Sequence, residues 1–401
     1  MDSRRNFLGK MASGLAVAAA PSSVLGANDR IRLGIIGPGD RGMQDVHEAM
    51  ACPNTEFVGF ADIYTRRLDA AKALVPSAKT YLDYRYLLDD KNVDAVIIAT
   101  PQHLHCEHFV AALDAGKHVY QEKTMAFTVD HAKRMRTAYK KAGKRTVQIG
   151  HQGCSTGQVP DAASFLAASD KMGKITALHM HMYRNTPHGK PQWTREIYPD
   201  MTPEHIIWKA FLGESPQREF DANRYRNWRF YWDYSGGNIY ENMCHQIAFW
   251  YKVMNLQIPK AATMTGGVYL WKDGREVPDT MNVALEHPEE MLISWDSGFG
   301  NSELGFSEDA LGTDGTISKT MSSIKYLPQR ENQPKGTERV GETKTAPHAH
   351  MQNFLDCVRS GQTPTCPFEL GFRVSIACRM TVESYRQGRT IKWDPVREEL
   401  V

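Results

Sequence analysis

The feature that most constrains this chain is a glycine-rich loop between a short apolar run and an amphipathic stretch. Residues 31–36 read Ile-Arg-Leu-Gly-Ile-Ile, which predicts a buried strand, and residues 43–50 have the spacing of a helix. Between them, Gly37, Gly39 and Gly42 follow the pattern G-x-G-x-x-G. In that context the first glycine makes a tight turn, the second lets a pyrophosphate approach the backbone, and the third lets helix and strand pack closely. The loop therefore predicts a dinucleotide-binding fold.

A carboxylate after the second predicted strand supports this interpretation. Asp62 follows the run 56–61 and lies about 20 residues past the loop, where an acidic side chain hydrogen-bonds the adenosine ribose hydroxyls. This carboxylate favours NAD because it would repel the 2′-phosphate of NADP, but Arg66 and Arg67 leave NADP open as the alternative. The cofactor residues predicted from these patterns are Gly37, Pro38, Gly39, Asp40, Arg41, Gly42 and Asp62.

The first 150 residues alternate between strand-like and helical patterns. Apolar runs at 93–99 and from 117 predict further buried strands, and 67–74 and 107–115 have helical spacing. Alternation of this kind predicts a doubly wound parallel sheet, the Rossmann architecture, over residues 28–150.

The second half has a different pattern, typical of an antiparallel sheet. In Ile175–Tyr183 polar and apolar side chains alternate, as they do in a strand with one buried face. Further strand-like runs separated by turns lie at 263–271, 280–285, 290–296 and 312–318. Helices are predicted at 349–360 and 372–387, and an exposed loop at 328–345. Residues 151–401 are therefore predicted to form an α+β domain with a large, mostly antiparallel open sheet. Its last helices are expected to pack back on the first domain.

Residues 1–27 have the anatomy of an export signal. Arg4 and Arg5 are followed by Phe7-Leu8, by an apolar stretch from Met11 to Ala20, and by small residues at 24–27. The apolar stretch is far shorter than the ~20 residues that cross a bilayer, so no stable membrane span is predicted. The paired arginines resemble a twin-arginine signal, which implies export through the bacterial twin-arginine machinery, to the periplasm or beyond. The alternative is a basic amphipathic N-terminus on a cytosolic protein.

Composition excludes several classes of protein. Of the 401 residues, 41% are hydrophobic and 23% charged, which excludes wholesale disorder and suits two domains. A net charge of +2 gives no dense positive face, so no nucleic-acid partner is predicted. The seven cysteines include no C-x-x-C spacing and are expected to be packing residues. His179, His181 and His188 lack a carboxylate or thiolate at ligand spacing, so no metal is predicted.

Residues 186–235 are unusually rich in tryptophan and tyrosine. Such a segment forms either part of the core or a wall on which the C–H faces of a sugar stack. On the second interpretation, the candidate substrate residues in and beside the segment are Arg184, Asn185, Trp193, Arg226 and Tyr234.

Taken together, these motifs resemble the Gfo/Idh/MocA oxidoreductase family over essentially the whole chain after the signal. The carrying residues are the loop 37–42, Thr100-Pro101 with His105, Glu122-Lys123, the run 236–245 from Gly-Gly to His, and 353–361 with its Asn-Phe-Leu-Asp-Cys and Ser-Gly. The resemblance adds Thr100, Pro101, His105, Glu122 and Lys123 to the cofactor site, with His105 expected on the nicotinamide side. It also implies a homo-oligomer, a dimer or a tetramer.

The resemblance also implies the catalytic residues. Lys123 matches the lysine of the family's Glu-Lys-Pro segment, with Thr124 in place of the proline, and Glu241 and His245 match its Asp-x-x-x-His pair. Hydride transfer from a carbinol carbon requires loss of the hydroxyl proton, which a histidine accepts near neutral pH. We therefore expect His245 to act as general base, Lys123 as electrostatic stabiliser and relay, and Glu241 as orienter or acceptor of a substrate hydroxyl. A solvated lysine, a satisfied helix histidine and a surface carboxylate are the structural alternatives.

Three functions remain after this comparison. The first is an NAD(P)-dependent oxidoreductase that keeps its cofactor bound and moves hydride to or from a sugar or glycoside. The second is an NAD-dependent glycoside hydrolase working by transient oxidation, elimination and re-reduction, which needs no pair of catalytic carboxylates. The third is a catalytically silent sugar-binding protein on the same fold.

Overall fold

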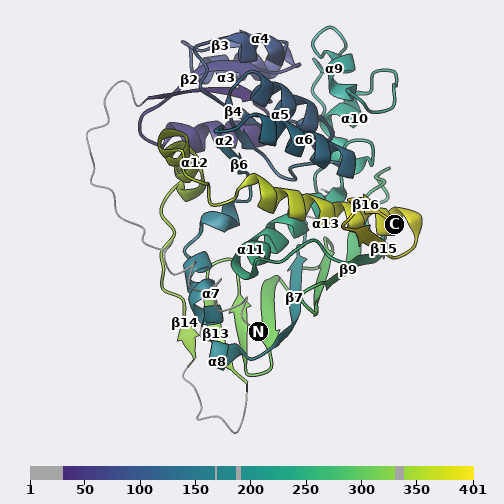
Figure 1. The fold of residues 1–401 in the computed structure, drawn as a ribbon. Coiled ribbons are helices and arrows are strands. Elements are labelled where there is room, and N and C mark those ends of the chain that lie inside the picture. Colours follow the sequence, from purple (N-terminus) through teal and green to yellow (C-terminus); the bar gives the residue numbers. More distant parts are fainter. Residues whose placement is uncertain (1–29, 168, 187–190, 330–337) are drawn as a thin grey trace. The chain divides into compact units, whose positions relative to one another are not determined.

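The computed structural model describes residues 30–167, 169–186, 191–329 and 338–401. Residues Ile31–Val401 form one compact unit with two sheets, drawn in Figure 1. The predicted export signal, His188 and residues 330–337 of the predicted loop lie outside the described residues.

The first sheet confirms the predicted Rossmann architecture. Its six strands are all parallel, in the order β3-β2-β1-β4-β5-β6. The strands are β1 Ile31–Ile36, β2 Thr55–Ala61, β3 Lys79–Tyr81, β4 Ala95–Ile98, β5 His118–Gln121 and β6 Val147–Ile149. The helices of this part are α2 Asp40–Met50, α3 Thr65–Leu74, α4 Tyr84–Asp89, α5 His105–Asp114 and α6 Val129–Lys141. The central strand β4 is buried at every position, because helices cover both faces of a doubly wound sheet.

The second sheet has ten strands in the order β14-β13-β12-β11-β7-β10-β9-β8-β15-β16. The strands are β7 Ile175–Tyr183, β8 Ala261–Gly267, β9 Thr280–His287, β10 Met291–Gly298, β11 Phe306–Gly312, β12 Gly315–Lys319, β13 Ile324–Pro328, β14 Arg339–Val340, β15 Ile391–Asp394 and β16 Glu399–Leu400. Only β7 and β10 pair in parallel, so the sheet is mostly antiparallel, as predicted. Strand β7 has the predicted bounds, with Leu178 and Met180 buried and His179 exposed.

The four later predicted strands have different bounds in the structure, and two of them, 280–285 and 290–296, shift by only one or two residues to become β9 and β10. The run 263–271 was predicted as one strand, but β8 ends at Gly267, because the Asp279 carboxylate accepts the backbone N–H groups of Tyr269, Leu270 and Trp271 and turns the chain aside. The run 312–318 contains a hairpin turn followed by most of β12, since β11 ends at Gly312 and β12 begins at Gly315.

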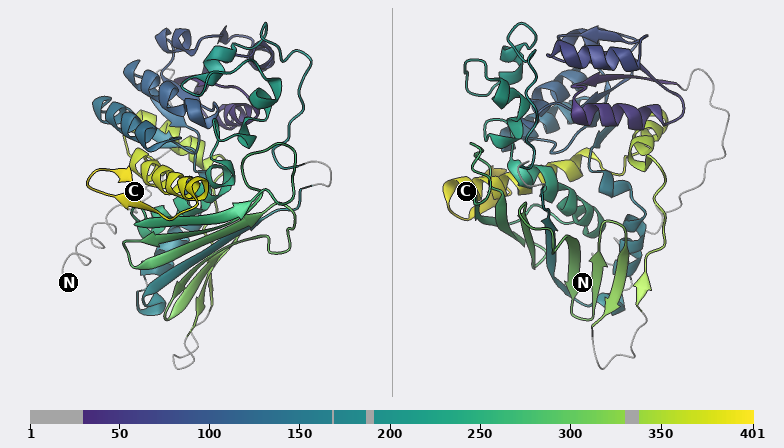
Figure 2. Two further views of the ribbon diagram at one scale, coloured as in Figure 1. Left: turned by 90° about the vertical axis from the view of Figure 1, so that its right-hand side faces the viewer. Right: turned by 180° about the vertical axis from the view of Figure 1, so that it is seen from behind.

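The α-helices described beyond residue 157 are α7 Gln158–Ala167, α8 Ser169–Met172, α9 Trp208–Leu212, α10 Ala222–Arg226, α11 Cys244–Met254, α12 Ala349–Ser360 and α13 Phe368–Gln387. Of these, α11 and α13 lie between the two sheets (Figures 1 and 2). Helix α13 contacts α6 and β6 on one side and β8 on the other. Helix α12 places Met351, Phe354 and Leu355 in the apolar cluster of β1 and β2. Among the described residues, no helix is both long and apolar enough to cross a membrane.

The aromatic segment is mainly core. Tyr225, Phe230 and Tyr234 belong to one buried cluster, and the ring of Trp193 packs edge-on against Phe299 with centroids 5.3 Å apart. The seven cysteines are all buried and unpaired by disulfides, which confirms that they are packing residues.

Candidate active site

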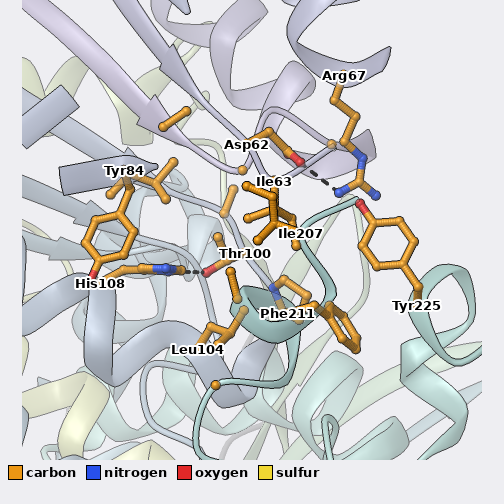
Figure 3. A pocket seen from close by; sticks show the side chains of 18 of the residues that line it. Asp62, Ile63, Arg67, Tyr84, Thr100, Leu104, His108, Ile207, Phe211 and Tyr225 are labelled. Atoms are coloured by element: carbon orange, nitrogen blue, oxygen red, sulfur yellow. Dashed lines mark hydrogen bonds and ion pairs between the residues drawn. The ribbon is translucent and has the colours of Figure 1, made fainter. Parts of the chain in front are cut away.

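A cavity of about 580 Å³ lies at the carboxyl ends of β1, β2 and β4 (Figure 3). Open parallel sheets bind their ligands at this edge, because the loops that leave neighbouring strands diverge there. The cavity is lined by Gly37, Gly39, Asp40 and Arg41 of the glycine loop, by Asp62, and by Thr100 and Pro101. Seven of the predicted cofactor residues therefore share one cleft.

The glycine loop has the geometry that a pyrophosphate requires. Gly37 has φ +89°, a conformation that favours glycine, and a Cβ on Gly42 would lie 2.2 Å from the Gly37 carbonyl oxygen. Helix α2 begins after Gly39 without a side-chain cap, so its first N–H groups are free to bind an anion. The cradle and its donors fit a dinucleotide.

Asp62 lies where a ribose carboxylate is expected, but it has a cationic neighbour. Its carboxylate accepts the N–H of Tyr64 at 2.9 Å and lies 3.6 Å from the guanidinium of Arg67, which faces the Tyr225 ring (Figure 3). Burial raises the pKa of Asp62, while Arg67 opposes that shift. Arg66 instead pairs with Asp200, so only one of the two arginines that left NADP open lines the cavity.

His105 supports this cleft from within the protein. It is buried, and its ring nitrogens lie 2.8 Å from the Thr124 carbonyl oxygen and 2.9 Å from that of Thr100. The ring therefore joins the loop after β4 to the turn after β5. His105 lines neither of the two cavities described here, and both of its ring nitrogens lie against backbone carbonyls. Its place on the nicotinamide side stays a prediction. Beside it, His108 lies 3.0 Å from the hydroxyl of Thr100.

The turn after β5 is held in place by contacts of Glu122 and Thr124 with other segments. The buried Glu122 carboxylate accepts from Arg41 at 3.0 Å, and the same guanidinium lies 2.8 Å from Asp45. The hydroxyl of Thr124 donates to the Tyr240 carbonyl at 2.9 Å, and the peptide bond between Lys123 and Thr124 is cis. The threonine at the family's proline position thus ties Lys123 to the segment that carries Glu241.

Lys123 and Glu241 form a nearly buried ion pair. The ammonium donates to the Glu241 carboxylate at 2.8 Å, and the two side chains are 12% and 9% exposed. The other carboxylate oxygen accepts from Gln102 at 2.8 Å and lies 3.2 Å from Arg229. Burial works against ionisation, but Arg229 and Lys123 outweigh it and lower the pKa of Glu241 to about 2. Glu241 therefore stays ionised and holds Lys123 in place through the ion pair. Its roles as orienter or as acceptor of a substrate hydroxyl stay predictions.

A π-helical turn presents Glu241 to the site. Residues Ile239–Met243 form this turn and α11 follows directly, so Glu241 and His245 do not lie on one regular α-helix as the spacing predicted. Turns of this kind are rare and occur often at functional sites. Both side chains line a second cavity of about 550 Å³, which adjoins the first at Arg41.

His245 is held neutral by its surroundings. Burial lowers its pKa well below 6.5, and the charge of Lys123 lowers it further. Its ring meets His151 edge-on with centroids 5.4 Å apart, and neither ring nitrogen of His151 has a hydrogen-bond partner among the described residues. A neutral imidazole facing a cavity beside an ammonium group can accept a proton from a hydroxyl.

The five candidate substrate residues lie in four different places. Arg184 lines the second cavity together with His245. Arg226 lines the first cavity, 3.4 Å from Asp40, so it belongs to the cofactor side. Asn185 is exposed and lines neither cavity, and Trp193 and Tyr234 are buried in the aromatic cluster. The sugar-stacking role expected of Trp193 and Tyr234 is wrong, because their rings pack against other aromatic side chains.

Sequence reasoning missed three residues of the site. Gln102 and Arg229 bind Glu241, and His151 packs on His245. Gln102 directly follows Thr100-Pro101 at the ligand-binding edge of the sheet, which was a usable signal. Arg229 is one of several arginines in the aromatic segment, and no local pattern distinguishes it.

Relatives with known names match this chain in part or in full. Inositol 2-dehydrogenase of Salmonella paratyphi B is 38% identical over 122 residues, which are 30% of this chain and 36% of that enzyme. The chain thus spans about a third of the length of the first relatives it matches. A scyllo-inositol 2-dehydrogenase (NADP(+)) of Bacillus subtilis is 21% identical over 90% of this chain and 96% of its own. Levoglucosan dehydrogenase, solved with NADH and levoglucosan, superposes with a TM-score of 0.70 and 18% identity over 90% of this chain and 99% of its own.

Family models cover most of the described residues. Residues 31–151 match the oxidoreductase family with an NAD-binding Rossmann fold, and residues 215–393 match the C-terminal α/β domain of the same family. The two matches include the glycine loop, Lys123, Glu241 and His245. This chain belongs to the Gfo/Idh/MocA oxidoreductase family.

Proposed function

We propose that this protein is an NAD(P)-dependent dehydrogenase that moves hydride between a tightly held nicotinamide cofactor and a hydroxyl-bearing carbon of a sugar. The observation that carries the proposal is the ion pair of Lys123 and Glu241 beside a neutral His245, where the dinucleotide cleft adjoins the second cavity. The named relatives are dehydrogenases of inositols and of levoglucosan, which are polyhydroxylated rings.

The side chains divide the chemistry between them. His245 accepts the hydroxyl proton, since its lowered pKa leaves it neutral. Lys123 stabilises the negative charge that develops on the substrate oxygen, and Glu241 fixes the position of Lys123 through the 2.8 Å ion pair. When bound, the nicotinamide ring supplies the hydride acceptor for oxidation and the donor for the reverse reaction.

NAD is the cofactor we favour, because Asp62 is placed to receive ribose hydroxyls and would repel a 2′-phosphate. Arg67 beside it keeps NADP as the alternative, and one relative is named as NADP-dependent. Parallel titrations of the protein with NADH and NADPH decide between the two. We propose net redox chemistry and not the glycosidase route, since the relatives named above are dehydrogenases.

Residues 1–27 support a proposal about location. We propose that they direct the folded protein through the twin-arginine machinery to the periplasm, which requires the dinucleotide to travel bound. Purified protein, once denatured, should release a near-stoichiometric amount of dinucleotide, and an empty protein that exchanges NAD freely would contradict this. Sedimentation analysis of the same sample tests the expected homo-oligomer.

The test of the activity is a screen of polyols and sugars for formation of reduced nicotinamide. We expect turnover with at least one class of cyclic polyol, and a loss of about 10²–10⁴-fold in kcat for Lys123→Met, the range that positioned proton-transfer groups supply. Arg397→Gln, an exposed arginine far along the chain, is the control. Cleavage of an aryl glycoside without net formation of reduced cofactor would refute the dehydrogenase.

A further inference from the structure

The second cavity contains one guanidinium that no carboxylate neutralises. Arg184 follows β7 directly and lines this cavity together with His245. Its Nη2 donates to the Oδ1 of Asn242 at 3.0 Å and lies 3.8 Å from the sulfur of Met182. Among the described residues, no carboxylate oxygen lies within ion-pair distance of it. Glu241 is the acidic group that influences it, and both of its carboxylate oxygens are already engaged.

The other cations of the same cavity are matched by buried acids. Arg41 lies 2.9 Å from Glu122 and 2.8 Å from Asp45. Lys319 lies 2.9 Å from Glu308, and a tryptophan N–H also donates to that carboxylate. Arg184 differs from both, because it has no carboxylate partner among the described residues. The remaining carboxylate of the cavity, Glu48, contacts His348 and not Arg184.

A chain of buried polar groups holds Arg184 in position. Asn242 accepts from Arg184 and donates to Asn238, whose amide donates to the hydroxyl of Ser297 at 2.8 Å. Ser297 then donates to the backbone carbonyl of Met182 at 2.5 Å. Asn242, Asn238 and Ser297 are 8%, 1% and 0% exposed, so the chain is sealed from solvent. Asn242 and the Met182 sulfur engage the Nη2 group of the guanidinium, and the N–H groups on Nε and Nη1 remain for a ligand.

The charges around Glu241 also favour a ligand with a negative charge. Three cations, Lys123, Arg229 and Arg184, influence one carboxylate. A neutral polyol in this cavity would leave Arg184 partly desolvated without a partner, which costs free energy. Burial already lowers the pKa of Arg184, as expected for a guanidinium that lacks an anion. A ligand with one negative charge removes this cost.

We infer that the substrate is a sugar acid whose carboxylate forms a bidentate pair with Arg184 while its reacting hydroxyl meets His245 and Lys123. This inference rests on the proposed function and names the substrate class of that site. A planar guanidinium fork matches a carboxylate in shape and in charge. A phosphate dianion would need a second free cation, and Lys319 is already paired with Glu308.

The test compares matched ligands on the NADH-loaded full chain by calorimetry. The pairs are glucuronate against glucose and galacturonate against galactose, which differ only in the carboxylate. We expect at least one acid to bind about 10- to 100-fold more tightly than its neutral partner, the value of hydrogen bonds to a charged group. Arg184→Gln should abolish the preference and Arg184→Lys should restore part of it. Arg389→Gln should leave it unchanged, since Arg389 is exposed and has no carboxylate partner in the part of the chain that the structure describes.

Each other outcome is decisive. Equal binding of acid and neutral sugar, binding of neither, or a preference that survives in Arg184→Gln overturns the inference. A parallel assay with the protein loaded with oxidised NAD, in which formation of reduced nicotinamide from the same ligands is measured, separates this result from the proposed function. Oxidation of neutral sugars without a preference for acids would support the dehydrogenase activity and contradict the sugar acid as its substrate. Binding of the acid through Arg184 without any turnover would support a sugar-acid ligand and contradict the dehydrogenase activity.

Discussion

At the scale of single residues, one buried carboxylate gathers the charged side chains of the candidate site. Glu241 accepts hydrogen bonds from Lys123 and Gln102 and lies against Arg229, so three donors share its two oxygens. Its pKa of about 2 keeps it ionised under all ordinary conditions. In the proposed mechanism its function is geometric, because it fixes the ammonium group of Lys123.

Replacement of this carboxylate tests the geometric role. Glu241→Gln keeps an acceptor for Gln102 but loses the charge that holds Lys123, and we expect kcat to fall by about 10²-fold with a smaller change in KM. Glu241→Asp should recover part of the loss. Steady-state kinetics with the best polyol measures both constants. A variant with unchanged kcat and a raised KM would show that Glu241 binds substrate instead.

The pH dependence follows from the state of His245. The imidazole must be neutral to accept a proton, and burial with the charge of Lys123 lowers its pKa well below 6.5. Falling pH therefore protonates it late, so kcat/KM should stay flat through pH 6.5 and fall only at distinctly lower pH. Glu241 contributes no limb in this range, because its pKa is about 2. An acid limb of unit slope centred near pH 6.5 would contradict a desolvated base.

At the scale of elements, the loop between β1 and α2 leaves no room for side chains at its glycines. A methyl group on Gly42 would meet the Gly37 carbonyl oxygen at 2.2 Å, so the backbone of the loop must move. The same displacement moves the first N–H groups of α2, which are the donors for the pyrophosphate. The sequence alone predicted this role for the glycines, because their spacing depends on the local path of the backbone.

Gly42→Ala should therefore lower the affinity for NADH more than it lowers the stability of the folded protein. Overpacking of this kind costs about 1–3 kcal/mol, which corresponds to roughly 10- to 100-fold in affinity. Fluorescence titration with NADH measures the dissociation constant. Gly143→Ala is the matched control, since Gly143 has φ +62° with open space around it and suffers only backbone strain. Equal loss of affinity in both variants would mean that the effect is one of stability.

At the scale of the whole molecule, the C-terminal sequence completes the N-terminal core. Helix α12 inserts Phe354, which is fully buried, against the Tyr120 ring with centroids 5.7 Å apart. All eight tryptophans lie at or beyond Trp193, so their fluorescence reports on the second half of the chain. The described residues from Ile31 onward also form one compact unit. The two sheets should therefore unfold together.

Phe354→Ala tests this coupling, because it damages the core of the first sheet while the optical signal comes from the second half. We expect the free energy of unfolding to fall by about 3–5 kcal/mol, the usual cost of a large cavity, with a single tryptophan-fluorescence transition in urea. Val358→Ala, at a partly buried position of the same helix, should cost less. A tryptophan transition that does not move would show that the two sheets unfold independently.

Local patterns in the sequence determined much of this protein. Spacing in the sequence predicted four features, because each depends on neighbouring residues. They are the glycine loop, the alternation of strands and helices in the first domain, strand β7 and helix α12. Lys123, Glu241 and His245 were identifiable because they follow short motifs. The export signal stays a prediction, since residues 1–27 lie outside the described residues.

Only the tertiary structure decided where the remaining side chains point. Gln102 reaches Glu241 across 139 residues of chain, and Arg226 joins the cofactor cleft through Asp40, 186 residues away. Trp193 and Tyr234 turned into the core while Arg184 faced the second cavity, although all three are plausible sugar contacts by type. The physical reason is that a side chain's direction is set by the packing of elements distant in sequence, and no local pattern contains that information.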